Sequence, residues 1–185
     1  MKIACLGWGS LIWQPESLLI RRKWFNDGPL LPIEFVRQSE NGRLTLVISE
    51  NAKPVRTLWA LMATEDLTEA KNSLGVREGI PKSKFASWIA SIEKTEKAPG
   101  EIQKIIQSWA ESLDLDDVIW TNIPAKFNGI DNTEPTPEEA IQYINSLDIN
   151  RQALAEEYVR KAPKQIDTQF RRKFESEFGW TFIEE

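Results

Sequence analysis

Histidine is absent from this chain of 185 residues. Its absence excludes Ser-His-Asp and Cys-His nucleophile systems, and it removes the zinc sites that contain histidine. The single cysteine, Cys5, can form neither an intramolecular disulfide nor an all-thiolate zinc site. Acid–base chemistry must therefore come from Glu, Asp, Lys, Tyr, Cys5 or backbone groups. We expect neither a metal ion nor a cofactor.

Long apolar runs and an excess of positive charge are also missing. No stretch approaches the roughly 18 apolar residues of a membrane span. The N-terminal apolar run is cut off by Gly7 and Gly9, which leaves it too short for a signal sequence. The net charge of −5 opposes binding to nucleic-acid phosphates and acidic membranes. These features predict a soluble cytoplasmic protein that binds neither nucleic acid nor membranes.

Apolar and polar residues alternate, or form short apolar runs, in segments that we expect to be strands. Asn41-Gly42 separates two alternating segments, and this dipeptide is typical of a tight hairpin. Short connections between the first strands favour antiparallel pairing. The predicted strands are 2–6, 31–39, 44–48, 55–63 and 117–123.

Helical spacing of apolar residues and capping signals dominate the rest of the chain. Thr136-Pro137-Glu138-Glu139 is typical of a helix start, and Asn150 is expected to cap the following helix. The segment 17–24 stays open between loop and short helix, and 127–135 is expected to be loop. Strands followed by helices indicate an α+β fold. The predicted helices are 66–75, 85–92, 102–113, 136 onward, 150–162 and 170–178.

The first predicted strand runs into a glycine-rich turn, Gly7-Trp8-Gly9-Ser10-Leu11. Two glycines permit positive φ angles and a close approach of a ligand to the backbone. Successive N–H groups in such a turn form an anion-binding concavity, and Ser10 adds a hydroxyl donor. The turn has neither the third glycine of a dinucleotide fingerprint nor the Gly-Lys-Ser/Thr of a phosphate-binding loop. A tight turn at a packed corner explains the same residues.

Among the carboxylates, Glu78 has a distinctive setting. It lies in an apolar stretch framed by Gly75, Gly79 and Pro81. A carboxylate in such a constrained, apolar loop is a place where the pKa rises toward neutrality. The alternative is a loop glutamate that is paired with Arg77.

Three segments resemble the gamma-glutamylcyclotransferase-like superfamily, and the ChaC branch most closely. Leu6-Gly7-Trp8-Gly9-Ser10-Leu11-Ile12-Trp13 is similar to the Phe-Gly-Tyr-Gly-Ser-Leu-Ile-Trp of that branch. Residues 74–78 are similar to a segment that ends in Arg-Glu, and Tyr158 to Pro163 is weakly similar to a later Tyr…Ala-Pro segment. The chain departs from the pattern at Trp8, where the family usually has Tyr, and at Leu6, where it has an aromatic residue.

The resemblance implies a single domain over residues 1–185, with a small, mostly antiparallel, barrel-like sheet and flanking helices. Residues 1–125 would contain the sheet, and the helices of 130–185 would pack on it. The implied activity is cyclisation of the glutamyl part of a small gamma-glutamyl amine or peptide to 5-oxoproline, without metal or cofactor. Glu78 would be the general base and acid. The implied substrate-binding residues are Gly7, Trp8, Gly9, Ser10 and Leu11.

Two other functions remain open at this point. One is a non-catalytic module on the same fold that binds a small anionic or amino-acid-like ligand. The other is a protein-interaction surface around Arg171-Arg172-Lys173, beside Phe170 and Phe174. The oligomeric state is left open.

Overall fold

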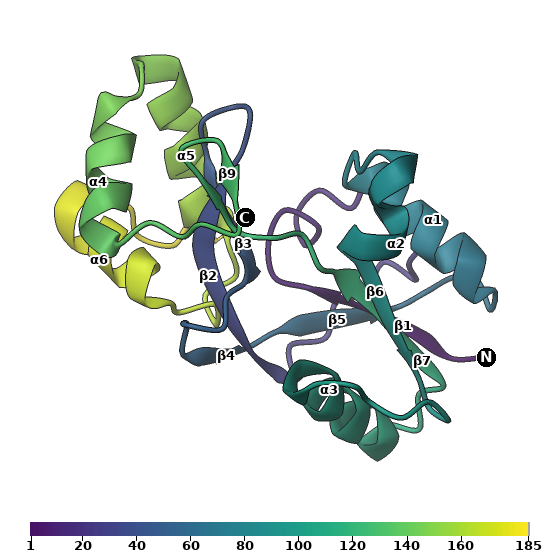
Figure 1. Cartoon of the computed structure of the whole chain (residues 1–185). Helices are drawn as coiled ribbons and strands as arrows, with labels where there is room; N and C mark the ends of the chain where they lie inside the picture. Colours follow the sequence, from purple (N-terminus) through teal and green to yellow (C-terminus); the bar gives the residue numbers. More distant parts are fainter. Residues whose placement is uncertain (185) are drawn as a thin grey trace. The chain divides into compact units, whose positions relative to one another are not determined.

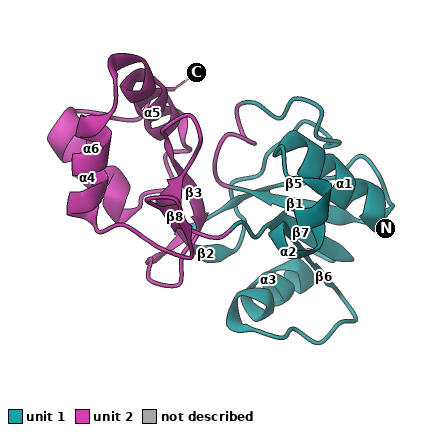
Figure 2. Cartoon of the chain, turned by 45° about the horizontal axis from the view of Figure 1, so that its top comes forward, with its two compact units in different colours: residues 1–7, 14–31, 56–123 teal, residues 8–13, 32–55, 124–185 magenta. Residues whose placement is uncertain are grey.

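The computed structural model describes residues 1–184, and it is an α+β fold with six α-helices and two curled sheets, one of them a half-barrel (Figure 1). The predicted α+β class with a barrel-like sheet and flanking helices is confirmed. The chain forms two compact units, each assembled from three segments (Figure 2). That they make up one domain stays a prediction. Unit 1 comprises 1–7, 14–31 and 56–123, and unit 2 comprises 8–13, 32–55 and 124–185.

Unit 1 contains a sheet of four strands in the order β5-β1-β7-β6. Strand β1 pairs with β5 antiparallel and with β7 parallel, and β6 pairs with β7 antiparallel. All five residues of β1 and all five of β7 are buried, as expected for central strands covered on both faces. The strands are β1 (Ile3–Gly7), β5 (Leu58–Leu61), β6 (Ile89–Glu93) and β7 (Asp117–Thr121).

The helices of unit 1 differ in one place from the prediction. Asp66 caps the first helix by accepting a hydrogen bond from the backbone N–H of Glu69, as its sequence indicated. The predicted helix 85–92 is wrong, since only its first four residues are helical and β6 begins at Ile89. Pairing of β6 with β7 outweighs the helical spacing of the apolar residues. The helices are α1 (Leu67–Arg77), the 3₁₀ turn η1 (Lys82–Lys84), α2 (Phe85–Trp88) and α3 (Glu101–Ser112).

The second sheet has the order β3-β2-β8-β9, with β4 also paired to β2. The hairpin at Asn41-Gly42 is confirmed, and Gly42 adopts a φ of 84° there. Segment 127–135 was predicted to be loop, but a second hairpin turns at Asn128 and Gly129, both with positive φ. The predicted strand 55–63 is divided into β4 and β5. The strands are β2 (Leu30–Gln38), β3 (Leu44–Ile48), β4 (Pro54–Arg56), β8 (Lys126–Phe127) and β9 (Ile130–Asp131).

Three helices complete unit 2. The capping box at Thr136 is confirmed, since its side chain and that of Glu139 bond each other's backbone N–H groups. The cap of the next helix is Asp148 rather than Asn150, because the Asp148 carboxylate accepts from the first free N–H groups. The helices are α4 (Pro137–Ser146), α5 (Ile149–Lys161) and α6 (Gln169–Phe178).

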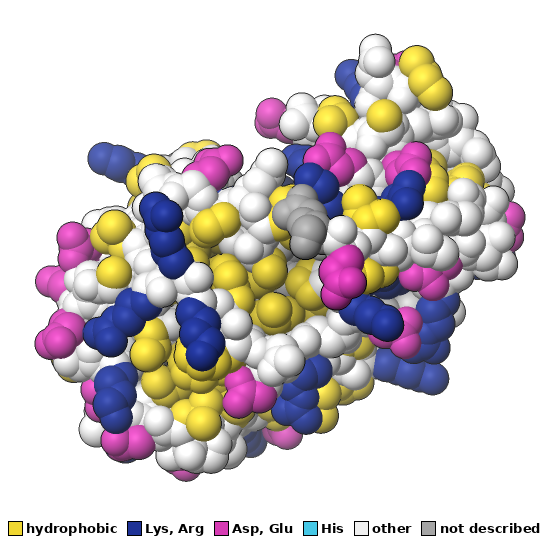
Figure 3. All heavy atoms as spheres, turned by 180° about the vertical axis from the view of Figure 1, so that it is seen from behind, with side chains coloured by type: hydrophobic (Ala, Val, Ile, Leu, Met, Phe, Trp, Pro, Cys, Tyr) yellow, Lys and Arg dark blue, Asp and Glu magenta, His cyan; other side chains and the backbone are white. Residues whose placement is uncertain are grey.

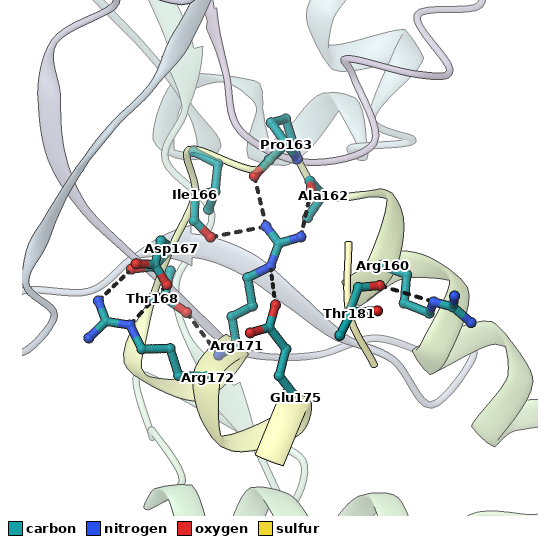
Figure 4. A network of polar contacts seen from close by, with 10 residues as sticks. All are labelled: Arg160, Ala162, Pro163, Ile166, Asp167, Thr168, Arg171, Arg172, Glu175 and Thr181. Carbon is teal, nitrogen blue, oxygen red and sulfur yellow. Dashed lines mark hydrogen bonds and ion pairs between the residues drawn. The ribbon is translucent and has the colours of Figure 1, made fainter. Parts of the chain in front are cut away.

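A buried arginine, Arg171, ties α6 to the end of α5 (Figure 4). Its side chain is 2% exposed and donates hydrogen bonds to the carbonyls of Ala162, Pro163 and Ile166. Arg172 and Lys173 pair with neighbouring carboxylates. The triad therefore has structural partners, which weighs against its use as a basic surface for another protein.

The charged surface carries no large field of one sign on the face that Figure 3 presents, where basic and acidic side chains are interspersed. Within residues 1–184, no helix combines the length and apolar character that crossing a membrane requires.

Candidate functional site

The glycine-rich loop Trp8–Trp13 belongs to unit 2, whereas the residues on either side of it belong to unit 1. Strand β1 ends at Gly7, and the N–H of Ile12 then donates to the carbonyl of Gly9 at 3.0 Å, which closes a turn. Neither Gly7 nor Gly9 has a positive φ. The expected use of these glycines for a left-handed backbone is therefore wrong.

Gly9 is required by the space around it. A Cβ atom at this position would lie 2.4 Å from the hydroxyl oxygen of Tyr158, which no real contact allows. Tyr158, on α5, is 6% exposed and its hydroxyl accepts the N–H of Leu46 at 3.3 Å. Trp13, at the end of the loop, meets the Tyr158 ring edge-on with 5.5 Å between centroids. A phenolic hydroxyl thus reaches the loop from α5.

The side chains of Trp8 and Leu11 face the protein interior. Trp8 is 3% exposed and its indole N–H donates to the carbonyl of Leu46 at 3.1 Å, while Leu11 is 5% exposed. Trp8 therefore holds the loop on β3. Of the five predicted substrate-binding residues, Ser10 is the one whose side chain is both polar and partly exposed.

Four backbone N–H groups of the loop have no acceptor. Within residues 1–184, the N–H groups of Trp8, Gly9, Leu11 and Trp13 donate no hydrogen bond. Gly9 and Leu11 are both buried residues, and buried backbone donors are almost always satisfied. These two donors, together with the Tyr158 hydroxyl, are groups that can hold a carbonyl or carboxylate oxygen.

Glu78 lies in unit 1, where it ends α1. Its backbone N–H donates to the carbonyl of Leu74 at 3.0 Å, and its carboxylate lies 2.7 Å from Nη1 of Arg77. The side chains of Arg77 and Glu78 are only 8% and 20% exposed. The ion pair with Arg77 that the sequence suggested for Glu78 is therefore present.

Arg77 also binds the segment that follows the loop. Its Nε and Nη2 donate to the carbonyl of Gln14 at 3.0 and 2.5 Å. Gln14 is the first residue of unit 1 after Trp13. One guanidinium therefore holds both the Glu78 carboxylate and the exit of the loop.

The pKa of Cys5, in the middle of β1, is affected by the charges of Arg77 and Glu78. Burial raises the pKa of the Cys5 thiol, the negative charge of Glu78 raises it further, and Arg77 lowers it. The thiol thus stays protonated and is removed from the candidates for acid–base chemistry.

The structure brings Gly9, Trp13 and Tyr158 together in unit 2, and Gln14, Arg77 and Glu78 together in unit 1. Sequence reasoning identified the loop and Glu78, but gave Tyr158 only a weak similarity and no role. In the sequence, the one signal for Tyr158 was that Gly9 needs a bulky neighbour to explain why glycine stands there. Within residues 1–184, no group of three or more Cys, Asp or Glu side chains could hold a metal ion. Comparison of the chain with protein-family models, with curated proteins and with solved structures finds no match.

Proposed function

We propose that this protein is a gamma-glutamylcyclotransferase-like enzyme, which converts a small gamma-glutamyl amine or peptide to 5-oxoproline and a free amine. Glu78 is the proposed general base and acid, and residues 7–11 hold the substrate. The proposed compartment is the cytoplasm, since one buried cysteine gives no support for an oxidising one.

The observation that carries the proposal is the double role of Arg77. It pairs with Glu78 and binds the carbonyl of Gln14, where the chain leaves the loop. The loop also begins at Gly7, the last residue of β1, and Glu78 acts electrostatically on Cys5 of that strand. Both ends of the loop and the carboxylate are thereby fixed in unit 1.

The reaction needs little from the protein because the substrate carries its own nucleophile. The alpha-amino nitrogen attacks the gamma-carbonyl carbon, a bond forms between them, and the bond from that carbon to the leaving nitrogen breaks. Closing a five-membered ring within one molecule mainly requires the correct substrate conformation. The Glu78 carboxylate would take one proton from the alpha-ammonium group and pass it to the leaving nitrogen, and the second proton that the attacking nitrogen loses on ring closure would follow the same route, so that the amine leaves as an ammonium ion. The N–H groups of Gly9 and Leu11 are suited to the oxygen that gains negative charge.

The test is release of 5-oxoproline from a panel of gamma-glutamyl amines, amino acids and peptides. General acid–base catalysis typically contributes about 10²–10⁴-fold, so Glu78→Gln should reduce kcat by at least about 100-fold. Glu69→Gln, which alters an exposed glutamate at the start of α1, is the matched control and should retain activity. A Glu78→Gln enzyme with full activity would refute the role of Glu78.

The alternative is a non-catalytic module that binds a small anionic or amino-acid-like ligand. It is favoured by the fact that the unsatisfied N–H groups and Tyr158 lie together in unit 2, without Glu78. Binding of a gamma-glutamyl compound without release of 5-oxoproline from any member of the panel would support this alternative.

A further inference from the structure

Arg43 lies on the ring of Tyr158, the residue that contacts the glycine-rich loop. It follows Gly42 in the turn between β2 and β3, and its guanidinium carbon is 5.4 Å from the centre of the Tyr158 ring. The same ring meets Trp13 at its edge and reaches Gly9 with its hydroxyl. Arg43, the aromatic pair and the loop all belong to unit 2.

Apart from the Tyr158 ring, the guanidinium of Arg43 has no ionic or hydrogen-bond partner within residues 1–184. It makes neither an ion pair nor a side-chain hydrogen bond there, and its Nε is buried without an acceptor. The side chain is only partly exposed. A buried N–H donor without an acceptor is destabilising unless a hydrogen-bond partner compensates it.

Two other arginines of unit 2 have carbonyl or carboxylate partners for their guanidinium groups. Arg37 binds the carbonyl of Pro124 at 2.7 Å and lies 3.6 Å from the Asp131 carboxylate. Arg171 has three carbonyl acceptors, as described above. Arg43 has aromatic contact and no acceptor, so its missing partner is expected to come from outside the chain.

We propose that Arg43 binds a carboxylate of the ligand held at the loop and thereby determines which compounds the site accepts. A guanidinium can donate two parallel hydrogen bonds to a carboxylate, and this geometry makes Arg selective for such groups. One unpaired positive charge matches the single charge of a carboxylate. The nearby Arg151, which packs against Gly42, is already paired with Asp148 at 3.5 Å.

The identity of the ligand as a gamma-glutamyl compound rests on the proposed function, whereas the carboxylate site does not. Such a compound offers a carboxylate in two places, on the alpha carbon of the glutamyl part or on the leaving part. The first would make Arg43 a general requirement for binding. The second would make it the residue that favours gamma-glutamyl amino acids and peptides over gamma-glutamyl amines.

Probes without an alpha-amino group separate these cases because they cannot cyclise. Glutaryl-ethylamide carries only the glutamyl-side carboxylate, butanoyl-alanine carries only the one on the leaving part, and butanoyl-ethylamide carries neither. Their dissociation constants are measured by isothermal titration calorimetry with the wild type, Arg43→Gln, Arg43→Lys and the control Arg151→Gln. Thermal unfolding of each variant establishes that it is folded.

We expect Arg43→Gln to weaken binding of one of the two acids at least tenfold and to leave the other within twofold. Arg43→Lys keeps the positive charge but loses the two parallel donors of the guanidinium. Its affinity for that acid should therefore lie between those of the wild type and Arg43→Gln, and Arg151→Gln should bind like the wild type. Unchanged binding of both acids by folded Arg43→Gln overturns the inference. So does an equal loss in Arg151→Gln, or a wild type that binds neither acid.

Turnover distinguishes this inference from the proposed function. Arg43-dependent binding without release of 5-oxoproline from any gamma-glutamyl compound supports the carboxylate site and contradicts the enzyme. Release of 5-oxoproline by a protein whose ligand binding does not depend on Arg43 supports the enzyme and contradicts the carboxylate site.

Discussion

The contact between Gly9 and Tyr158 gives the most direct test of the loop structure. In Gly9→Ala the new methyl group would lie 2.4 Å from the Tyr158 hydroxyl oxygen. The tyrosine cannot turn away easily, because Leu46 donates to its hydroxyl and the rings of Trp13 and Phe35 pack on it. Overpacking of this kind typically costs about 1–3 kcal/mol. We expect Gly9→Ala to lower the free energy of unfolding by that amount.

Removing the hydroxyl should remove the penalty. In Tyr158→Phe the nearest remaining atom, Cζ, would lie 3.4 Å from the methyl group, which is an ordinary contact. Since Gly9 does not have a positive φ, alanine fits its backbone. It also restricts the unfolded chain, which is worth about 0.4–1 kcal/mol. The alanine substitution should therefore be neutral, or stabilising by up to about 1 kcal/mol, in the Tyr158→Phe background.

Urea unfolding of the wild type, both single variants and the double variant measures this coupling. Gly79→Ala is the control, because Gly79 has a φ of 62° and no atom within 4 Å of its missing Cβ. Its cost, about 1–2 kcal/mol of backbone strain, should be the same in the wild-type and Tyr158→Phe backgrounds. An equal cost of Gly9→Ala in both backgrounds would refute the steric explanation.

Two further outcomes concern other buried charges. Arg171→Met removes three hydrogen bonds to carbonyls, at about 1 kcal/mol net each. Urea unfolding should show a loss of about 3 kcal/mol, and a clearly smaller loss for Arg172→Met, whose ion pair is exposed to solvent. Burial raises the pKa of Glu34 above its ordinary 4.5, although N–H groups at the start of α6 oppose this. Stability from its protonated form is therefore complete below 4.5 and is lost as the pH rises through the folded-state pKa. Relative to Glu34→Gln, the wild type should lose stability as the pH is raised above 4.5, and a constant difference would contradict this.

Local signals predicted the fold where one short segment decides the structure. The capping box at Thr136 and the hairpin at Asn41-Gly42 depend on neighbouring residues, and both are confirmed. The helix expected at 85–92 failed because the pairing partner of Ile89–Glu93 is a strand far along the chain. Periodicity within a segment does not carry information about such a partner.

In the candidate site, too, local features were predicted from the sequence and long-range contacts were not. The loop and Glu78 were predicted from their composition and their resemblance to a family, but the reason for Gly9 was predicted wrongly. The glycine accommodates Tyr158, and no local rule connects these two residues. Arg43 was missed because its significance lies in the partners that it lacks, which only the structure reveals.

The division of unit 2 into three chain segments has a consequence for how the protein is made. A ribosome produces Trp8–Trp13 well before α5, which carries Tyr158. Since unit 2 can close only when all three of its segments have emerged, Gly9 meets Tyr158 only after α5 has been synthesised. Contacts between such distant residues also form slowly. A nascent chain that stops before α5 would lack Tyr158, the residue that packs on Trp13 and reaches Gly9.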